Sequence, residues 1–280
     1  MRSNDPAGLE AYGNAILIQT ESESILDRLT TQLVRAVPGI RPLPRAPEKG
    51  LLNFRVVPEP HDRVSIFESG EPVARHVSIE FAVDQICTIA RIKVAEYAVG
   101  MTFIHAGVVA FRDKAIVLPA QSYKGKTSLV AELVRMGATY FSDEYAVFDR
   151  EGNVHPFAKP LSVREVAGSH LQTERDVEEF GGHKGIGKAE VGLVLFTEYV
   201  PGAIWSPRKL TPAVAVFEMI RHCVPIRRDP EFTLETLRTV ANLSPAYATQ
   251  RGETKAASRN ILDILEGGVW QLRPDPDRSA

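Results

Sequence analysis

The chain has 280 residues, of which 44% are hydrophobic and 24% are charged, a composition typical of a globular protein with one large or two small domains. Its net charge of −2 and pI of about 6.4 predict no broad basic surface for nucleic acid or anionic lipid. No apolar run approaches the roughly 20 residues that a membrane span needs, and the first residues lack the apolar core of a signal peptide. We therefore expect no nucleic-acid or membrane partner. Cys87 and Cys223 have no Cys or His at metal-ligand spacing, so we expect buried free thiols and a cytoplasmic location.

The first hundred residues predict a small α+β domain. The expected elements are a strand over 14–20, a helix over 22–33 capped by Ser22 or Ser24, an irregular Pro-rich connection over 38–50, strands over 51–57 and 64–68, and a helix over 79–99. Gly100 is a favourable C-terminal stop for the last of these helices. We therefore place the first domain over 1–99.

From Thr102 onward the sequence predicts alternating strands and helices. The expected elements are strands over 103–111 and 115–118, a helix over 126–136, strands over 139–141, 145–148 and 190–196, helices over 211–223 and 231–243, a strand over 246–251 and a helix over 255–265. This order indicates an α/β sheet with ligands at the strand ends. We assign it to a second domain over 100–272, followed by a frayed tail over 273–280.

A phosphate-binding loop is predicted between the strand over 115–118 and the helix over 126–136. The segment matches the P-loop pattern G-x-x-x-x-G-K-[ST], with alanine in place of the first glycine. Its residues are Ala120, Gln121, Ser122, Tyr123, Lys124, Gly125, Lys126 and Thr127. Backbone N–H groups and the helix N-terminus would hold the phosphates, Lys126 would reach the β- and γ-oxygens, and the Thr127 hydroxyl would ligate Mg²⁺. A surface turn that contains Gly-Lys-Thr by chance is the alternative, and the flanking strand and helix favour ATP and Mg²⁺.

Asp143 and Glu144 come directly after the strand over 139–141, where a magnesium-nucleotide site usually needs a carboxylate. Adjacent side chains point to opposite sides of an extended chain, so we expect the two carboxylates to face different partners. One would meet the metal or an acceptor hydroxyl. A solvated turn is the alternative, which the apolar runs on both sides disfavour.

A second glycine-rich run, over 181–188, looks like a phosphate loop but has no buried strand before it and no apolar-periodic helix after it. We interpret it as a mobile loop near the site. His170 and His183 show no ligand spacing, and we expect both to be exposed.

Several motifs together resemble the catalytic domain of HPr kinase/phosphorylase, and most closely the HPr-kinase-related serine kinases. They are His105-Ala-Gly107, the P-loop, Ser142-Asp143-Glu144, His155-Pro156-Phe157 and Pro160-Leu161-Ser162-Val163-Arg164. The resemblance covers roughly residues 102–265. It implies a P-loop kinase domain akin to that of phosphoenolpyruvate carboxykinase, preceded by a small α+β domain.

The resemblance also implies roles for individual residues. His105 would lie near the catalytic acid, and Asp143 would be the general base with Glu144 as its neighbour. Because Ser162 stands where the family has a metal-assisting glutamate, metal binding shifts toward Glu144 or Glu165, together with Thr127. Each of these residues could instead have a purely structural role. His105, for example, could be a core histidine with satisfied hydrogen bonds.

Arg164 or Arg208 would neutralise charge on the transferred group. Arg164 ends the quoted signature, and Arg208 or Lys209 corresponds loosely to a basic residue on the loop before a late helix. The alternatives are a surface ion pair for Arg164 and a helix start for Arg208 and Lys209.

The implied activity is an ATP- and Mg²⁺-dependent kinase that transfers the γ-phosphate to a serine, or a similar hydroxyl, of a protein or peptide acceptor. Residues 1–99 would contact the acceptor or a partner protein. The sequence is also compatible with a homo-oligomer. Two other functions remain: a non-catalytic nucleotide-binding regulatory module, and a kinase for a small molecule such as free serine.

Overall fold

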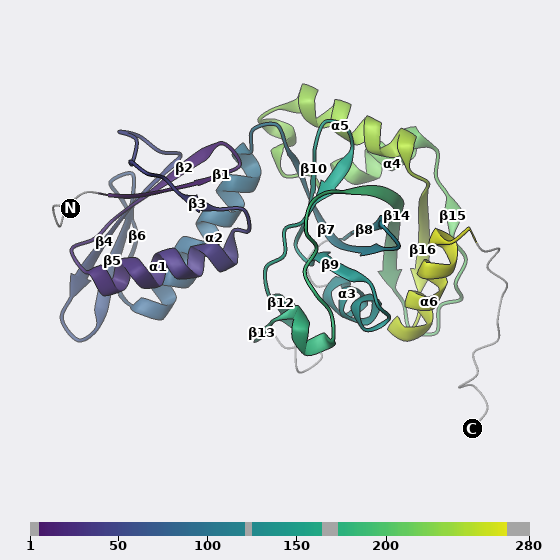
Figure 1. Cartoon of the computed structure of the whole chain (residues 1–280), viewed down its shortest axis with the longest axis horizontal. Coiled ribbons are helices and arrows are strands. Elements are labelled where there is room, and N and C mark those ends of the chain that lie inside the picture. The colour runs from purple at the N-terminus through teal and green to yellow at the C-terminus, as the bar shows by residue number, and fades with distance from the viewer. Residues whose placement is uncertain (1–5, 121–124, 164–172, 268–280) are drawn as a thin grey trace. The chain divides into compact units, whose positions relative to one another are not determined.

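The computed structural model describes residues 6–120, 125–163 and 173–267. The chain divides into two compact units, Met1–Gly100 and Met101–Ala280 (Figure 1). Both combine helices with β-sheets, which confirms the predicted α/β class in its general form.

The first unit has one six-stranded sheet in the order β3-β1-β2-β4-β5-β6. Its elements are β1 (Ala7–Ala11), β2 (Asn14–Gln19), α1 (Glu23–Ala36), β3 (Arg41–Pro42), β4 (Leu52–Glu59), β5 (Arg63–Glu68), β6 (Glu71–Ser78) and α2 (Ile79–Tyr97). Strands β2 and β4 are parallel and are connected through α1, whereas the other neighbours are antiparallel. A crossover through a helix is the usual way to join parallel strands.

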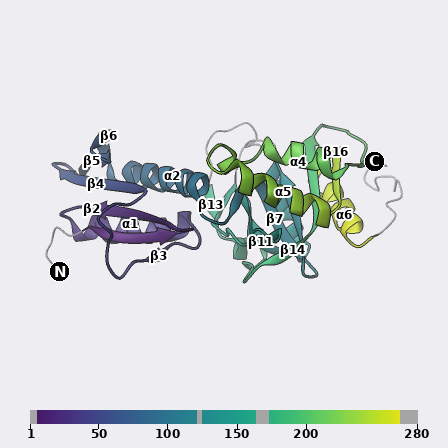
Figure 2. The same ribbon diagram turned by 90° about the horizontal axis from the view of Figure 1, so that it is seen from above.

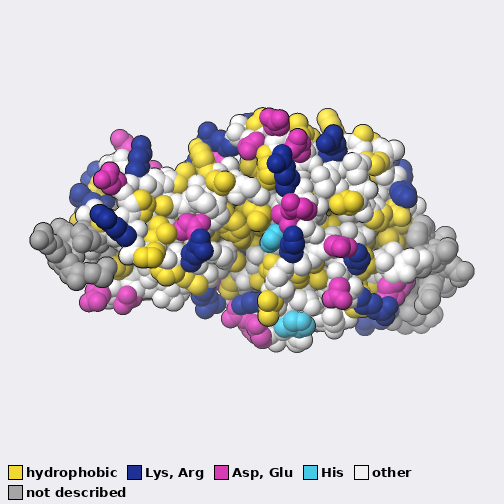
Figure 3. Space-filling model, turned by 45° about the horizontal axis from the view of Figure 1, so that its top comes forward, with side chains coloured by type: hydrophobic (Ala, Val, Ile, Leu, Met, Phe, Trp, Pro, Cys, Tyr) yellow, Lys and Arg dark blue, Asp and Glu magenta, His cyan; other side chains and the backbone are white. Residues whose placement is uncertain are grey.

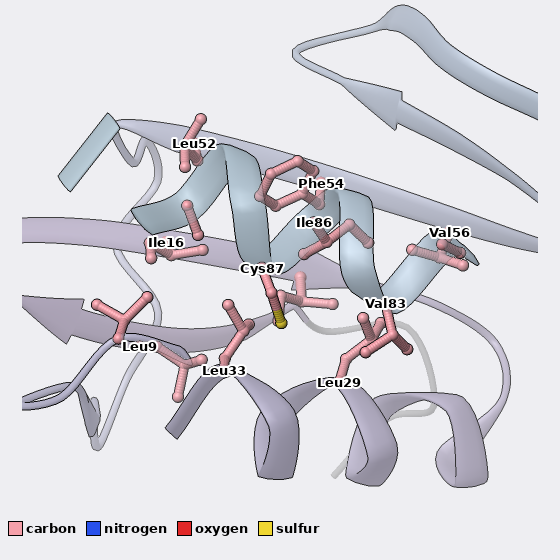
Figure 4. Close-up of a cluster of buried hydrophobic side chains, with 14 of the residues drawn as sticks. Leu9, Ile16, Leu29, Leu33, Leu52, Phe54, Val56, Val83, Ile86 and Cys87 are labelled. Carbon is pink, nitrogen blue, oxygen red and sulfur yellow. The ribbon is translucent and has the colours of Figure 1, made fainter. Parts of the chain in front are cut away.

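The two helices of this unit begin at serine caps and share one core. Ser22 Oγ accepts a hydrogen bond from the N–H of Ile25, and Ser78 caps α2 in the same way. Leu29 and Leu33 of α1 pack with Ile86 of α2 and the sheet residues in a single buried cluster (Figure 4). The apolar spacing of the helices therefore decides which face they bury.

Strand β1 was missed by the sequence analysis, and the irregular connection predicted over 38–50 is wrong at β3. Strand β1 forms a hairpin with β2 in which Ala11 lies opposite Asn14. The two-residue loop, Tyr12-Gly13, has positive φ at both positions, as a tight hairpin requires. Strand β3 is the edge strand of the sheet and pairs only with β1. It has two residues, one of them a proline, so it shows no periodicity in the sequence.

The second unit is built on an eight-stranded sheet in the order β11-β10-β7-β8-β14-β16-β15, with β9 also paired to β7. Its helices and strands are β7 (Thr102–Phe111), β8 (Lys114–Pro119), α3 (Lys126–Arg135), β9 (Thr139–Ser142), β10 (Tyr145–Phe148), β11 (Asn153–His155), β12 (Leu161–Val163), β13 (Thr173–Arg175), β14 (Ala189–Tyr199), β15 (Arg208–Lys209), α4 (Pro212–Ile220), α5 (Pro230–Leu243), β16 (Ala246–Arg251) and α6 (Thr254–Leu265). Short 3₁₀ turns lie at Val177–Phe180 and Pro225–Arg227.

Helices cover both faces of this sheet. One buried cluster joins alternate residues of β7 and β8 to α4 and α5, and a second joins the residues between them to α3 and α6. Figure 1 shows α4 and α5 above the sheet with α3 and α6 below it, and Figure 2 shows the upper pair from above. Strands that are buried on both faces explain the unbroken apolar runs in the sequence.

The carboxyl ends of several strands meet at one edge of the sheet. Strands β8, β14 and β16 are mutually parallel, and β9 runs with them because both β8 and β9 are antiparallel to β7. Along this edge the order is β9, β7, β8, β14 and β16. In open α/β sheets, ligands bind outside the carboxyl ends of the strands.

Two further elements differ from the sequence-based expectations. The helix predicted over 211–223 ends at Ile220, because Cys223 leaves it to form a bridge with Ile104 of β7. Arg208 and Lys209 lie in the short strand β15 beside β16, and not at a helix start.

The helices of both units are short or polar, and charged side chains of both signs lie at the surface. Among the described residues, no helix is both long and apolar enough to span a membrane. On the face shown in Figure 3, basic and acidic side chains are interspersed. Cys87 and Cys223 are free cysteines, Cys87 being buried and Cys223 partly buried.

Candidate functional site

The predicted phosphate loop lies at the carboxyl end of β8. The N–H of Ala120 donates to the carbonyl oxygen of His105 on β7, at 3.2 Å. At the other end of the loop, Gly125 adopts the left-handed conformation, with φ of 75°, and α3 begins at Lys126. The strand before the loop and the helix after it are as predicted. Gln121, Ser122, Tyr123 and Lys124 lie outside the described residues.

Gly107 gives Lys126 room to reach the site. A Cβ at Gly107 would lie 2.6 Å from Cγ2 of Val130 and 3.0 Å from Cγ of Lys126. Burial lowers the pKa of Lys126, the carboxylates of Glu144 and Asp143 raise it, and the overall direction is downward. The ammonium group therefore lies in the same electrostatic neighbourhood as both carboxylates.

Asp143 is buried and held by several donors. Its Oδ2 accepts hydrogen bonds from the N–H of Ser162 at 3.1 Å and from the Thr127 hydroxyl at 3.4 Å, and its Oδ1 accepts one from the Tyr140 hydroxyl at 3.2 Å. A hydroxyl at the start of the helix and a carboxylate from a neighbouring strand are the protein groups that P-loop enzymes place around Mg²⁺. The structure puts Asp143, and not Glu144, beside Thr127.

A buried lysine joins the two carboxylates. Lys159 is 2% exposed, and its Nζ lies 3.4 Å from Oδ1 of Asp143 and 3.4 Å from Oε2 of Glu144. The same ammonium donates to Ser162 Oγ at 2.9 Å. Lys159 was not predicted from the sequence, although it is one of the two residues between two of the quoted motifs.

The extended chain assumed for Asp143 and Glu144 is wrong: both carboxylates reach Lys159, and only Asp143 also contacts Thr127. Residues 143 and 144 form a bend between β9 and β10. Ser142 Oγ stabilises this bend by accepting hydrogen bonds from the N–H groups of Glu144 and Tyr145, both at 3.0 Å. A serine in this position competes with extended structure in the usual way.

Two histidines lie on the same side of the loop as Asp143, on β7 and beside it. The backbone N–H of His105 donates to the carbonyl oxygen of His222 at 2.8 Å, and the His105 ring lies 4.8 Å from that of Tyr145. His222 Nδ1 is buried and has no hydrogen-bond partner among the described residues. Burial, followed by His105 and Lys126, lowers the pKa of His222. No signal in the sequence pointed to His222, which comes two residues after α4 ends.

A buried arginine contacts the loop from the opposite side. Arg251, at the end of β16, is 2% exposed, and its Nη2 donates to the carbonyl oxygen of Gly125 at 3.1 Å. Its guanidinium also lies 5.4 Å from the centre of the Tyr199 ring. The sequence predicted that a cation at Arg208 or Lys209 would act in the site. Arg208 is exposed in β15 and lies opposite Ala248 of β16. Arg164 and Glu165 lie outside the described residues.

The glycine-rich run over 181–188 packs against β9 and α3. Tyr140 accepts a hydrogen bond from Gly185 N–H and donates one to the carbonyl oxygen of His183. A Cβ at Gly182 or Gly185 would overlap a core side chain, so close packing explains these glycines. His183 is exposed, as predicted, and His170 lies outside the described residues.

The residues present fit a magnesium nucleotide. Lys126 supplies positive charge, Thr127 and Asp143 supply two oxygen ligands, and Gly125 gives the loop close access to a phosphate. No group of three or more His, Cys, Asp or Glu side chains among the described residues could hold a metal. Mg²⁺ normally takes one or two protein ligands and completes its shell with phosphate oxygens and water.

Comparisons with known proteins give a distant structural similarity. No protein-family model and no curated protein sequence matches this chain. Among solved structures, 46 chains match, including the structure of the Hpr(Ser) kinase/phosphatase from Coxiella burnetii. That chain is 12% identical over an alignment that covers 59% of this chain and 95% of that one, with a TM-score of 0.33.

Proposed function

We propose that this protein is an ATP- and Mg²⁺-dependent kinase that transfers the γ-phosphate to a serine, or a similar hydroxyl, of a protein or peptide. The observation that carries the proposal is the convergence of Lys126, Thr127 and Asp143 at the carboxyl edge of the second sheet. Lys126 and Thr127 begin α3, and Asp143 follows β9. Together they provide what phosphoryl transfer needs: positive charge, metal ligands and a proton acceptor.

In the proposed reaction, the acceptor oxygen forms a bond to the γ-phosphorus, the bond to the β–γ bridging oxygen breaks, and ADP leaves. Asp143 takes the hydroxyl proton. Lys126 and the backbone N–H groups at the start of α3 stabilise the negative charge on the phosphates. Bound Mg²⁺ would neutralise further charge, held by Thr127 and Asp143. Lys159, with Tyr140 and Ser162, fixes the orientation of Asp143.

Matched carboxylate variants test the proposal. Transfer from labelled ATP to serine-containing peptides, partner proteins and free serine is measured for wild type, Asp143→Asn and Glu144→Gln, together with MgATP affinity. Both substitutions remove one charge next to Lys159, but only Asp143 also contacts Thr127. We expect Asp143→Asn to lower turnover about 10²- to 10⁴-fold, the usual contribution of a positioned base, and Glu144→Gln to lower it far less. Equal turnover in wild type and Asp143→Asn would show that the mechanism is wrong.

One observation favours a second function, a nucleotide-binding regulatory module without catalysis. The Asp143 carboxylate accepts three hydrogen bonds and pairs with Lys159, which leaves it little capacity to accept a further proton. Normal MgATP binding by wild type and both variants, with no transfer to any acceptor, would favour this function over the kinase.

A further inference from the structure

The site has two sides, and the kinase chemistry uses only one of them. Asp143 follows β9, on one side of the phosphate loop, which itself follows β8. The ends of β14 and β16, at Tyr199 and Arg251, lie on the other side, and these two residues are paired in register. A nucleoside triphosphate is long, and its γ-phosphate must lie on the side where Thr127 and Asp143 meet. Its nucleoside end is then directed toward the ends of β14 and β16.

At this second side an exposed aromatic ring is held in place by buried and polar partners. The Tyr199 side chain is 43% exposed. The Arg251 guanidinium lies 5.4 Å from the ring centre, and the Tyr199 hydroxyl donates to Oε1 of Glu253 at 3.0 Å. The ring is thereby fixed in orientation while part of its surface stays accessible to a ligand.

Arg251 contacts both the phosphate loop and the Tyr199 ring. It is 2% exposed, its Nη2 holds the carbonyl oxygen of Gly125, and its Nε is buried without a hydrogen-bond partner among the described residues. A buried charge with an unsatisfied donor costs stability, and a well-packed apolar residue would avoid this cost. Because the same guanidinium contacts the phosphate loop and Tyr199, it sets the position of the ring relative to the bound phosphates.

We propose that Tyr199 forms a stacking subsite for the base of the bound nucleotide, and that Arg251 positions this subsite against the phosphate loop. The inference rests on the proposed function and extends it to the nucleoside. Aromatic side chains stack on any nucleobase because every base has a π-face. The subsite therefore favours nucleoside triphosphates over inorganic polyphosphates and discriminates weakly between adenine and guanine.

The test compares two ligands that share the phosphates but differ in the base. Binding of MgATP and of magnesium tripolyphosphate to the full chain is measured by calorimetry for wild type, Tyr199→Ala and Tyr199→Phe. Tyr199→Phe keeps the ring and loses only the hydroxyl bond to Glu253. Phe217→Ala serves as the control for unspecific effects, because it also removes an exposed aromatic ring. Phe217 lies on α4, and α4 and α3 cover opposite faces of the sheet.

We expect Tyr199→Ala to weaken MgATP binding about 5- to 100-fold, the usual effect of losing one base–aromatic stack. The affinity of Tyr199→Ala for tripolyphosphate should stay within about twofold of wild type. The affinities of Tyr199→Phe and Phe217→Ala for both ligands should also stay within about twofold of wild type. Equal effects of Tyr199→Ala on the two ligands, or none on either, would overturn the inference and leave the kinase proposal intact. Failure of the wild type to bind either ligand would overturn both.

Discussion

Lys159 provides the most direct test of how the candidate site is held together. Lys159→Met removes the ammonium group and keeps an unbranched chain of similar length in the buried space. Asp143 and Glu144 would then face each other without the cation that lies 3.4 Å from each. Lys126 is a second positive charge in their neighbourhood, and burial already disfavours its charged form.

The size of the effect follows from these distances. At an effective dielectric constant of about 20, two unit charges 3.4 Å apart attract by about 5 kcal/mol before desolvation is counted. Removing one partner of a buried ion pair typically destabilises a protein by about 3 to 5 kcal/mol, because the other charge stays buried. For a unit of this size, such a loss lowers the melting temperature by about 6 to 20 °C.

The assay is urea and thermal unfolding, followed by circular dichroism at pH 7. Lys188→Met is the matched control, since Lys188 is half exposed and pairs with Asp149 at 3.1 Å. Because the lysine of this pair is half exposed to solvent, we expect its loss to cost about 0 to 1 kcal/mol. In a second comparison, adding Asp143→Asn and Glu144→Gln to Lys159→Met should recover part of the lost stability, because the repelling charges are gone. If Lys159→Met costs no more than Lys188→Met, the burial of Lys159 between two carboxylates is wrong.

Three more outcomes are expected. Gly107→Ala should weaken MgATP binding and lower stability by about 1 to 3 kcal/mol, because its methyl group would displace Val130 and the stem of Lys126; calorimetry with unchanged affinity would contradict this. Burial raises the pKa of Asp149, but hydrogen bonds from neighbouring side chains outweigh it and lower the pKa to about 2. Asp149→Asn should therefore be less stable than wild type by about 1 to 2 kcal/mol at pH 7, and in acid unfolding this difference should disappear between about pH 4 and pH 2, below which wild type has lost the ionised carboxylate. Deleting residues 1–99 should spare MgATP binding and abolish transfer to a protein acceptor, and full transfer by the folded remainder would refute the role assigned to that segment.

Local patterns were sufficient to predict the elements around the phosphate loop. The Gly-Lys-Thr sequence lies at the start of α3, directly where the spacing placed it, and Asp143 follows β9 as expected. Both predictions depend only on residues that are close together in the chain. The failure at Glu144 also had a local cause, since Ser142 replaces the expected extended chain by a bend.

The residues that sequence reasoning missed are those brought in from far along the chain. Arg251 reaches the phosphate loop because the sheet places β16 beyond β14 and β8, and His222 lies beside β7 through its hydrogen bond to His105. Lys159 comes from the segment between β11 and β12. A lysine between an apolar run and a proline looks solvent-exposed in a single sequence, and nothing in its neighbours reveals that two carboxylates surround it. Burial of a charge depends on distant partners, so periodicity cannot predict it.

The anchor at the start of the phosphate loop has a practical consequence for mutagenesis. Ala120 and His222 are both held by the backbone of His105, through its carbonyl oxygen and its N–H group. Scanning substitutions change side chains and leave these two main-chain hydrogen bonds in place. Replacing His105 therefore reports on the imidazole ring, including its contact with Tyr145. The contribution of the two backbone hydrogen bonds is not seen in alanine scanning and would need an amide-to-ester replacement in the backbone.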